Sequence, residues 1–426
     1  MTTPAAADET SQPIELLLAV TRDGPRTLGA QIEDQLRRAI RNGALRPGAG
    51  IPSTRDLARQ IAVSRRVVVD AYAQLAAEGY LSLRQALATI TDADLGYSDP
   101  RGVKALRSAL ADYLGRVRGV VADPEHIIVT NGYTQGLGLV CHALAAAGAK
   151  RIALEDPSNP EDRLIAARAG LEPVAIGVDE GGTRVDELER AAADAIVLTP
   201  AHQHPTGVVL TGERRTALLA WLRASDAIAI EDDYDAEYRY DRAAIGALQG
   251  LDPDRVVYAG SASKTLAPAL RIGWLVVPPF LLEAVTREKH LADRGTARIE
   301  QHALADFLIR GELDRHLRRM RARYRGRRDA LVDALTQALP EAAVLGVAAG
   351  LHVTVQMPDS DNEQAIREEA HHRRVELETM SDYQPASRGR APALLLGYAQ
   401  MPEPAIRTGI HLLAEAVRAA RTRGDR

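Results

Sequence analysis

Residues 260–274 read GSASKTLAPALRIGW, and this stretch decides how the chain is interpreted. The sequence holds 53 lysines and arginines, of which only four are lysines, at positions 104, 150, 264 and 289. A lysine can lose its proton and react as an amine, whereas an arginine cannot do so at useful pH. We therefore interpret Lys264 as a functional amine, with an ordinary surface lysine as the alternative.

Length and charge indicate a chain of two unequal parts. The 426 residues exceed one ordinary hydrophobic core, and the 46% hydrophobic content is typical of a globular protein. The net charge of −4 is unevenly spread, because residues 26–84 hold ten arginines against five acidic residues. A basic segment on an otherwise acidic chain favours a nucleic-acid contact at one end, and ordinary scatter of arginine is the alternative.

The cellular setting is predicted from composition. The single cysteine, Cys141, excludes an intramolecular disulfide and lies in an apolar helical pattern, so we expect it in the core of a protein from a reducing compartment. The sequence has neither a signal-peptide pattern nor an apolar run that could span a membrane, and no metal site is expected. We therefore expect a cytoplasmic protein with a disordered tail over residues 1–25.

The basic segment has the pattern of a helix-turn-helix. Residues 27–42 predict a helix with one apolar face, and two short helices follow, which Ser53 and Ser64 would cap. The second of these begins Ser64-Arg65-Arg66, so its first turn is cationic and suits DNA phosphates and guanine edges. A helical hairpin with a solvated charged face is the alternative. The residues expected to face inward are Leu28, Ile32, Leu36, Ile40, Leu57, Ile61, Val68, Tyr72 and Leu75.

The remainder of the chain alternates short apolar runs with helical patterns such as residues 211–225. Runs buried on both faces are typical of a mostly parallel sheet, so the fold class is α/β with a doubly wound plan. Functional residues are expected at the carboxyl ends of the strands. The predicted strands are residues 126–130, 151–155, 195–199, 228–232, 255–260 and 273–278.

Unusual residues follow four of these strands, in TNGYTQG (130–136), TPAHQHPTG (199–207), EDDYDAEYRY (231–240) and the Lys264 stretch. Lys264 can form a Schiff base with an aldehyde, and Asp232 can pair with the protonated pyridine nitrogen of a pyridoxal cofactor. The Tyr234 hydroxyl can hydrogen-bond the ring phenolate. Ser261, Ser263 and Arg271 lie close enough in sequence to bind a phosphate beside Lys264.

Residues 45–81, LRPGAGIPSTRDLARQIAVSRRVVVDAYAQLAAEGYL, resemble the GntR-type winged helix. Roughly residues 90–420 resemble fold-type I aminotransferases. Three sequence motifs are similar to those of the MocR/GabR-type transcription regulators: LGYSDPRG (95–102), EDDYDAEYRY and SASKTLAPALRIGW. The resemblance implies a DNA-binding domain over residues 26–84 and a pyridoxal-phosphate-binding domain over 85–426, with a smaller C-terminal α+β lobe.

The resemblance also implies roles for individual residues. Arg55, Ser64, Arg65 and Arg66 would contact DNA. Lys264 would hold pyridoxal phosphate, with Asp232 at the pyridine nitrogen and Tyr234 at the 3-oxygen. The phosphate would be held by Ser261, Ser263, Arg271 and the backbone of Gly132, Tyr133 and Thr134. Tyr97 would reach the phosphate of a neighbouring subunit, which implies a head-to-tail homodimer.

The sequence departs from the family pattern at several places. Residues 82–90 lack the glycines of a wing, so the wing and the interdomain linker are expected to be short or absent. His204 stands where aminotransferases place an asparagine, and is either a cofactor contact or a solvated loop histidine. Asn159 replaces a ring-stacking aromatic. Leu395 replaces the arginine that binds the substrate carboxylate, with Arg388 and Arg390 as substitutes or as solvated charges.

These departures bear on function. Without a bidentate arginine clamp, transamination should be slow, while exchange of amines at Lys264 could persist and would suffice for a sensor. The first hypothesis is a transcription regulator that senses pyridoxal phosphate, or an amine or amino acid reacting with it, and that binds an operator with repeated half-sites. The alternative is an active aminotransferase with a vestigial head. A regulator whose large domain only dimerises is the third hypothesis.

Overall fold

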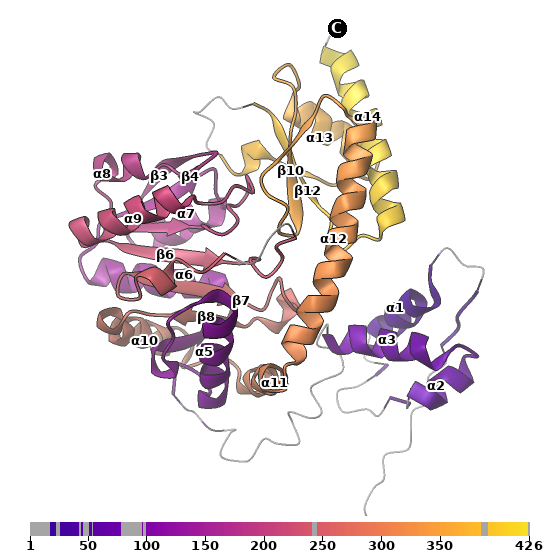
Figure 1. The fold of residues 1–426 in the computed structure, drawn as a ribbon, viewed down its shortest axis with the longest axis horizontal. Helices are drawn as coiled ribbons and strands as arrows, with labels where there is room; N and C mark the ends of the chain where they lie inside the picture. The colour runs from indigo at the N-terminus through magenta and orange to yellow at the C-terminus, as the bar shows by residue number, and fades with distance from the viewer. Residues whose placement is uncertain are drawn as a thin grey trace, which may run out of the picture. The chain divides into compact units, whose positions relative to one another are not determined.

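The computed structural model describes residues 18–22, 26–41, 44–45, 51–52, 54–77, 96, 99–240, 245–384 and 391–424. The chain divides into two compact units, residues 1–95 and 96–426 (Figure 1). The tail over residues 1–25 lies mostly outside the described residues, as do residues 78–95. The predicted domain boundary, the short wing and the short linker therefore stay predictions.

The first unit contains the three predicted helices, α1 (Leu28–Arg41), α2 (Thr54–Gln60) and α3 (Arg65–Ala77). The inward-facing pattern is confirmed, because Ile32, Leu36, Leu57, Val68 and Leu75 are fully buried in one cluster. Helix α3 begins directly after Ser64, whose Oγ accepts the Val67 N–H at 3.5 Å. The cap expected from Ser53 lies outside the described residues.

The second unit is built on a sheet of eight strands within the described residues, in the order β1-β8-β7-β6-β5-β2-β3-β4. All six predicted strands are present. Strand β8 runs antiparallel to both neighbours and β4 antiparallel to β3, while the other neighbours pair in parallel. The strands are β1 (Ile127–Thr130), β2 (Arg151–Asp156), β3 (Glu172–Asp179), β4 (Gly182–Thr183), β5 (Ala195–Leu198), β6 (Ile228–Asp233), β7 (Val256–Ser261) and β8 (Gly273–Val276).

Both faces of this sheet are covered, which explains the continuous apolar runs of its strands. In β1, Ile128 packs against α6, α7 and α10, whereas Ile127 and Val129 pack into the cluster on the opposite face. This alternation along one strand matches the two-residue period of β structure. The helices are α5 (Lys104–Arg118), α6 (Tyr133–Ala146), α7 (Pro160–Arg168), α8 (Leu188–Ala191), α9 (Gly212–Ser225), α10 (Pro279–Asp293) and α11 (Arg298–Ile309).

The predicted C-terminal α+β lobe is also present. Helix α12 (Glu312–Ala338) leads into it and packs along α14 (Glu403–Gly424), as Figure 1 shows. The lobe has an antiparallel sheet in the order β11-β12-β10-β9, and α13 packs against α14. The remaining elements are β9 (Ala343–Leu345), β10 (His352–Gln356), α13 (Glu363–His372), β11 (Glu378–Thr379) and β12 (Ala393–Gly397).

Strand β10 of this lobe contacts a loop of the large sheet. The Pro205 carbonyl accepts hydrogen bonds from Thr354 Oγ1 and from His352 Nε2, the latter at 3.3 Å. Nearby, Gly350 permits a close approach, because a Cβ there would lie 2.3 Å from Cε1 of His202. The lobe is thus in direct contact with the loop that carries His202 and His204.

Strand register gathers the predicted functional stretches at one edge of the large sheet. Thr130 and Ser261 both pair with Gly273, one on each side of β8. Asp232 pairs with Ala259, two residues before the end of β7. The turn after β1, the end of β6 and the Lys264 loop after β7 therefore start from the same edge.

Cys141 is fully buried in α6, and burial raises the pKa of its thiol to about 12. It belongs to the cluster that α6 and α10 form against the sheet. Among the helices of the described ranges, none is long and apolar enough to cross a bilayer.

Candidate functional site

The acidic run at the end of β6 contains four carboxylates that are buried and partnered within the chain. They are Glu231, Asp233, Asp235 and Glu237. Glu231 accepts hydrogen bonds from the backbone N–H groups of Leu248 and Gln249. Asp233 accepts hydrogen bonds from the Arg118 guanidinium and the Tyr258 hydroxyl. Glu237 accepts a hydrogen bond from the Tyr113 hydroxyl, and Asp235 lies within hydrogen-bond distance of the His202 ring. A buried charge is costly unless it is paired, and each of these four is.

Asp232 is the exception in this run. It is half-buried, and within the described residues its carboxylate forms no hydrogen bond or ion pair. Burial, followed by the nearby carboxylates of Asp162 and Asp233, raises the pKa of Asp232 well above its usual range. A carboxylate in this position would be stabilised in its charged form by a cationic N–H donor, and the protonated nitrogen of a pyridine ring is such a donor.

Lys264 lies in the turn that follows β7 and is exposed. In the described part of the chain it makes no hydrogen bond or ion pair. Its neighbour Ser263 donates its backbone N–H to Ser261 Oγ at 3.3 Å, which holds the start of the turn. The Lys264 side chain is therefore attached to an ordered strand end, and within the described residues it has no partner that a bound molecule would have to displace.

Two histidines, His204 and His352, interact electrostatically with this amine. Burial and then the neighbouring histidines hold the pKa of His204 well below its usual range, and the Lys264 ammonium adds to this effect. Burial, with a smaller contribution from His202, lowers the pKa of His352 to about 4, and Lys264 again contributes. His204 and His352 are consequently neutral at physiological pH.

His204 faces the interior of the site and not solvent. Its Nδ1 is buried and has no hydrogen-bond partner among the described residues. Its ring lies 5.7 Å from that of Tyr234 and 4.9 Å from that of Tyr383, both edge-on. A buried nitrogen without a partner is the kind of group that a bound molecule can satisfy.

Tyr234 is held at the same place by His202. The Tyr234 hydroxyl lies 3.0 Å from His202 Nδ1, and an Asp235 carboxylate oxygen lies 3.0 Å from the same nitrogen. If Nδ1 carries the proton and donates it to Asp235, the hydroxyl proton of Tyr234 is free for another acceptor. Burial, with Asp235 and Asp232 next, raises the pKa of Tyr234 well above its usual range, so the hydroxyl is a neutral donor.

The predicted phosphate residues meet around Gly132. This residue has φ of +91° and precedes α6, whose first-turn N–H groups, including those of Tyr133 and Thr134, have no partner in the helix. Arg271 donates to the Asn131 carbonyl at 2.7 Å, and a Cβ on Gly132 would lie 2.9 Å from Arg271 Nη2. A guanidinium beside a helix N-terminus is suited to an anion such as a phosphate.

The structure also places Leu395 and Asn159, two residues that differ from the aminotransferase pattern. Leu395 is buried with Met380 and Ala393, and Tyr383 packs against this group. Asn159 caps α7 by accepting the Glu161 N–H at 3.2 Å. Tyr97, Arg388 and Arg390 lie outside the described residues, so their predicted roles stay predictions.

Sequence reasoning missed three side chains of this region, His352, Tyr383 and Asp162. His352 and Tyr383 come from the C-terminal lobe, far along the chain, and no local pattern connects them to Lys264. Asp162 is buried and accepts the Tyr133 hydroxyl at 3.1 Å, and burial raises its pKa to about 7. The sequence did point to Asp162, because this residue directly follows the turn around Asn159 in which an aromatic residue was expected.

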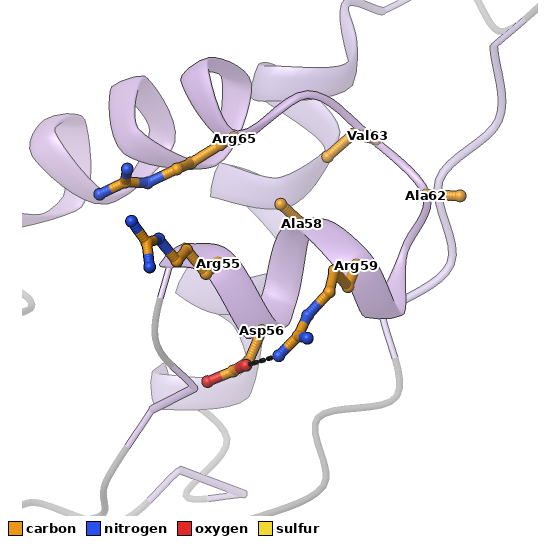
Figure 2. A pocket seen from close by; sticks show the side chains of 7 residues that line it. All are labelled: Arg55, Asp56, Ala58, Arg59, Ala62, Val63 and Arg65. Atoms are coloured by element: carbon orange, nitrogen blue, oxygen red, sulfur yellow. Dashed lines mark hydrogen bonds and ion pairs between the residues drawn. The ribbon is translucent and has the colours of Figure 1, made fainter.

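The second candidate site lies on the first unit. Arg55, Ser64, Arg65 and Arg66 are all exposed on α2, α3 and the turn between them. Figure 2 shows Arg55 and Arg65 extending toward the same side of a shallow pocket, while Arg59 turns to Asp56 in an ion pair. Arg65 also donates to Thr54 Oγ1 at 3.4 Å. Guanidiniums exposed on this face fit phosphates and base edges of DNA.

Comparison with known families agrees with this two-part description. Residues 28–90 match the model of bacterial regulatory proteins of the gntR family, and residues 64–383 match that of aminotransferase class I and II. The HTH-type pyridoxine biosynthesis transcriptional regulator PdxR of Corynebacterium glutamicum is 32% identical, with 80% of this chain and 86% of that regulator covered. The probable rhizopine catabolism regulatory protein MocR of Rhizobium meliloti is 28% identical, with 96% and 97% covered.

The solved structures similar to this chain include aminotransferases. A kynurenine aminotransferase from Pyrococcus horikoshii, in complex with pyridoxamine phosphate and kynurenine, superposes with a TM-score of 0.73 at 26% identity, covering 81% of this chain and 88% of that one. These comparisons confirm the predicted pairing of the two domains and the predicted cofactor, pyridoxal phosphate. The unpartnered groups of Asp232 and His204 and the cradle at Gly132 fit that cofactor.

Proposed function

The chain belongs to the transcription regulators that join a gntR-type head to an aminotransferase class I and II domain, and from this premise we propose that Lys264 binds pyridoxal phosphate and is the residue through which the effector is sensed. The observation that carries the proposal is the state of Asp232. It is the one carboxylate of residues 231–237 that lacks a partner within the described residues, and it lies one residue before the end of a strand next to the one that leads to Lys264.

When bound, pyridoxal phosphate supplies an aldehyde that condenses with primary amines and a ring that withdraws electrons. The chain's own residues bind and orient it. Asp232 would keep the ring nitrogen protonated, and Tyr234 and His204 would donate hydrogen bonds to the ring oxygen. Arg271, Ser261, Ser263 and the N–H groups that follow Gly132 would hold the phosphate.

Sensing requires that occupancy of Lys264 be linked to DNA binding. An effector can shift a protein between two states only by binding one of them more tightly. The amine interacts electrostatically with His204 and His352, and His352 belongs to the C-terminal lobe. Occupancy of Lys264 would therefore be felt next to a contact between the two lobes of the large domain.

Two effectors are compatible with the site: pyridoxal phosphate itself, or an amine or amino acid that reacts with it. The relative from Corynebacterium glutamicum is named as a regulator of pyridoxine biosynthesis, which favours the cofactor as effector. The apolar surroundings of Leu395 disfavour an effector that needs a carboxylate clamp at that position. A buried carboxylate without a cationic partner is costly.

DNA recognition is assigned to Arg55, Ser64, Arg65 and Arg66. We propose a head-to-tail homodimer, with Tyr97 at the phosphate of the neighbouring subunit, so that two heads read repeated half-sites of one operator. Half-site spacing follows from the distance between the two recognition helices.

The experiment is a visible spectrum of the purified protein with pyridoxal phosphate, followed by borohydride reduction and peptide mapping. We expect one reduced adduct, on Lys264. Operator binding should then be measured with and without pyridoxal phosphate at fixed salt, because affinity for DNA depends strongly on salt. An adduct on another residue, or operator binding that ignores the cofactor, would exclude the proposal.

An active aminotransferase is the second candidate, supported by the likeness to the kynurenine aminotransferase structure. Steady turnover of an amino acid with a keto-acid acceptor, together with loss of DNA binding at physiological salt, would favour it. The buried, apolar position of Leu395 predicts that turnover is slow.

A further inference from the structure

Lys289 is the second lysine with an unusual environment. Lys104 and Lys150 are exposed, whereas Lys289, in α10, has a side chain with 0% exposure. Its Nζ lies 2.6 Å from Asp293 Oδ2, 2.8 Å from Thr296 Oγ1 and 2.9 Å from Gln135 Oε1. An ammonium group has three N–H donors, so this set of acceptors is complete.

The partners of Lys289 bind the turn between β1 and α6. Asp293 Oδ2 also accepts Asn131 Nδ2 at 2.8 Å and Gln135 Nε2 at 2.7 Å. Gln135 Oε1 also accepts the backbone N–H of Asn131 at 2.8 Å. Residues 131 and 135 stand on either side of Gly132, so the turn is tied to α10 at both of its ends.

The same turn is tied to Arg271 on its other side. The Asn131 carbonyl accepts from Arg271 Nη2 at 2.7 Å. Asn131 is therefore held by its N–H, its side chain and its carbonyl at once. A continuous path of hydrogen bonds leads from the Lys289 ammonium through Asp293 and Asn131 to the Arg271 guanidinium.

Strand β1 is held by the same network. Thr296 Oγ1 accepts from Lys289 and donates to the Val129 carbonyl at 3.2 Å, one residue before the end of β1. Asp293 Oδ1 accepts the Gly295 N–H at 2.8 Å, which fixes the loop that carries Thr296. The start of α6, the end of β1 and the end of α10 thus share a single cation.

We propose that Lys289 is a positioning residue for the phosphate of pyridoxal phosphate, acting through Asp293, Gln135 and Asn131 on the turn at Gly132 and on Arg271. The inference rests on the proposed function, because it assumes that this turn receives the phosphate. Lys289 has two effects. It fixes the directions of the polar groups beneath the turn, and it neutralises the Asp293 carboxylate, which would otherwise repel a phosphate dianion.

Arginine is not an equivalent at this place. A planar guanidinium is larger and directs its N–H groups in a fixed fork, whereas the three acceptors around Lys289 Nζ come from three different elements. This explains why lysine is present in a chain that otherwise uses arginine almost throughout.

The test compares pyridoxal phosphate with pyridoxal, which has the same aldehyde and ring but no phosphate. Affinities of the wild type, Lys289→Met and Lys104→Met are measured from the visible absorption of the full-length protein. We expect Lys289→Met to bind pyridoxal phosphate about tenfold to 100-fold more weakly, as is typical of losing a hydrogen bond to a charged group. Pyridoxal affinity should change by less than about twofold, and Lys104→Met should match the wild type.

A second variant separates charge from structure. In the double variant Lys289→Met/Asp293→Asn, the repelling carboxylate is gone, and the amide oxygen introduced at position 293 can still accept from Asn131. We expect this variant to recover part of the affinity for pyridoxal phosphate. Equal losses for pyridoxal and pyridoxal phosphate would overturn the proposal, because a purely structural role weakens both alike. Unchanged affinity for pyridoxal phosphate in Lys289→Met would overturn it as well.

If Lys289→Met does not fold, Gln135→Met gives the same test. It removes the link from Lys289 to the Asn131 N–H that runs through Gln135, and leaves the Lys289–Asp293 pair and its bond to the Asn131 side chain intact. A loss confined to pyridoxal phosphate supports the proposal, and a loss shared with pyridoxal contradicts it. Failure of the proposed function is distinguishable, because the borohydride adduct on Lys264 would then be missing in the wild type too.

Discussion

Lys264 and Lys289 are two amines of the large domain that have opposite environments. Lys264 is exposed and, within the described residues, unbonded, while Lys289 is fully buried with three acceptors. Both residues are lysines in a chain that otherwise favours arginine, so residue type alone does not distinguish them. The hydrogen-bond partners do: a fully bonded amine orients its neighbours, and an unbonded one is available for reaction.

The largest effect is expected from removing Lys264, the amine proposed to react. We expect Lys264→Ala to lose all of the borohydride-fixed adduct with pyridoxal phosphate, because Lys289 has no free electron pair while its ammonium serves three acceptors. Mass spectrometry of peptides from the reduced protein measures this. An adduct on Lys289 in the variant would show that the buried amine is also reactive and would remove the distinction.

Asp232→Asn tests the proposed contact between Asp232 and the ring nitrogen of the cofactor. The amide cannot stabilise a protonated ring nitrogen, so we expect an affinity for pyridoxal phosphate about tenfold to 100-fold lower. Spectroscopic titration measures it. The control is Glu231→Gln, the preceding buried acid, whose partners are backbone N–H groups and which should change stability more than affinity. Similar affinity losses in both variants would argue against a special role for Asp232.

The low pKa of His352 predicts a pH dependence of stability. Its folded-state pKa is about 4, against an ordinary value of 6.5, so between these values the unfolded chain binds more protons. This contribution is fully present above about pH 6.5 and is lost as the pH falls toward 4, with a slope of up to about 1.4 kcal/mol per pH unit. Asp162, with a pKa raised to about 7, has the opposite sign.

The difference between wild type and His352→Gln isolates the histidine contribution. We expect the free energy of unfolding of the variant to fall less steeply between pH 6.5 and 4, in urea titrations at fixed temperature. Parallel curves for the two proteins would mean that His352 is protonated normally in the folded state, and its burial would then be in doubt.

A substitution in the first unit, Arg65→Ala, is expected to have the smallest effect on the surroundings of Lys264 and Lys289. Arg65→Ala should weaken operator binding by a factor of about five to 100, as for loss of one side chain that reads a base. Its spectrum with pyridoxal phosphate should be unchanged, and Arg59→Ala, whose guanidinium already pairs with Asp56, should bind DNA more nearly as the wild type does. Loss of the visible band in Arg65→Ala would contradict the assignment of separate roles to the two units.

Much of the fold was predictable because it depends on local patterns. Four-residue apolar spacing indicated the helices of the first unit, and short apolar runs indicated β1, β2, β5, β6, β7 and β8. Strand β3 was not predicted, because Glu172, Pro173 and its half-buried residues interrupt the apolar pattern. The C-terminal lobe was predicted only through the resemblance, since its strands are short.

The sequence offered candidate site residues where chemistry is concentrated in one stretch, as around Lys264 and Asp232, and their roles stay predictions. The site was not predictable where partners are distant in sequence. The set around Lys289 joins residues 131, 135, 289, 293 and 296, and the histidine group joins residues 202, 204 and 352. Such sets arise from strand register and from the contact between lobes, which no local periodicity encodes.

The carbonyl of Pro205 accepts from two side chains of β10, and one of them is the His352 imidazole, which interacts electrostatically with Lys264. That imidazole is neutral, so it contributes an ordinary dipole and not a full charge to the junction. Because burial is the main cause of the low pKa of this ring, the imidazole stays neutral whether or not the neighbouring nitrogen carries a charge. A molecule attached to that nitrogen would therefore act on the junction through the packing around a neutral ring, with no large rearrangement required.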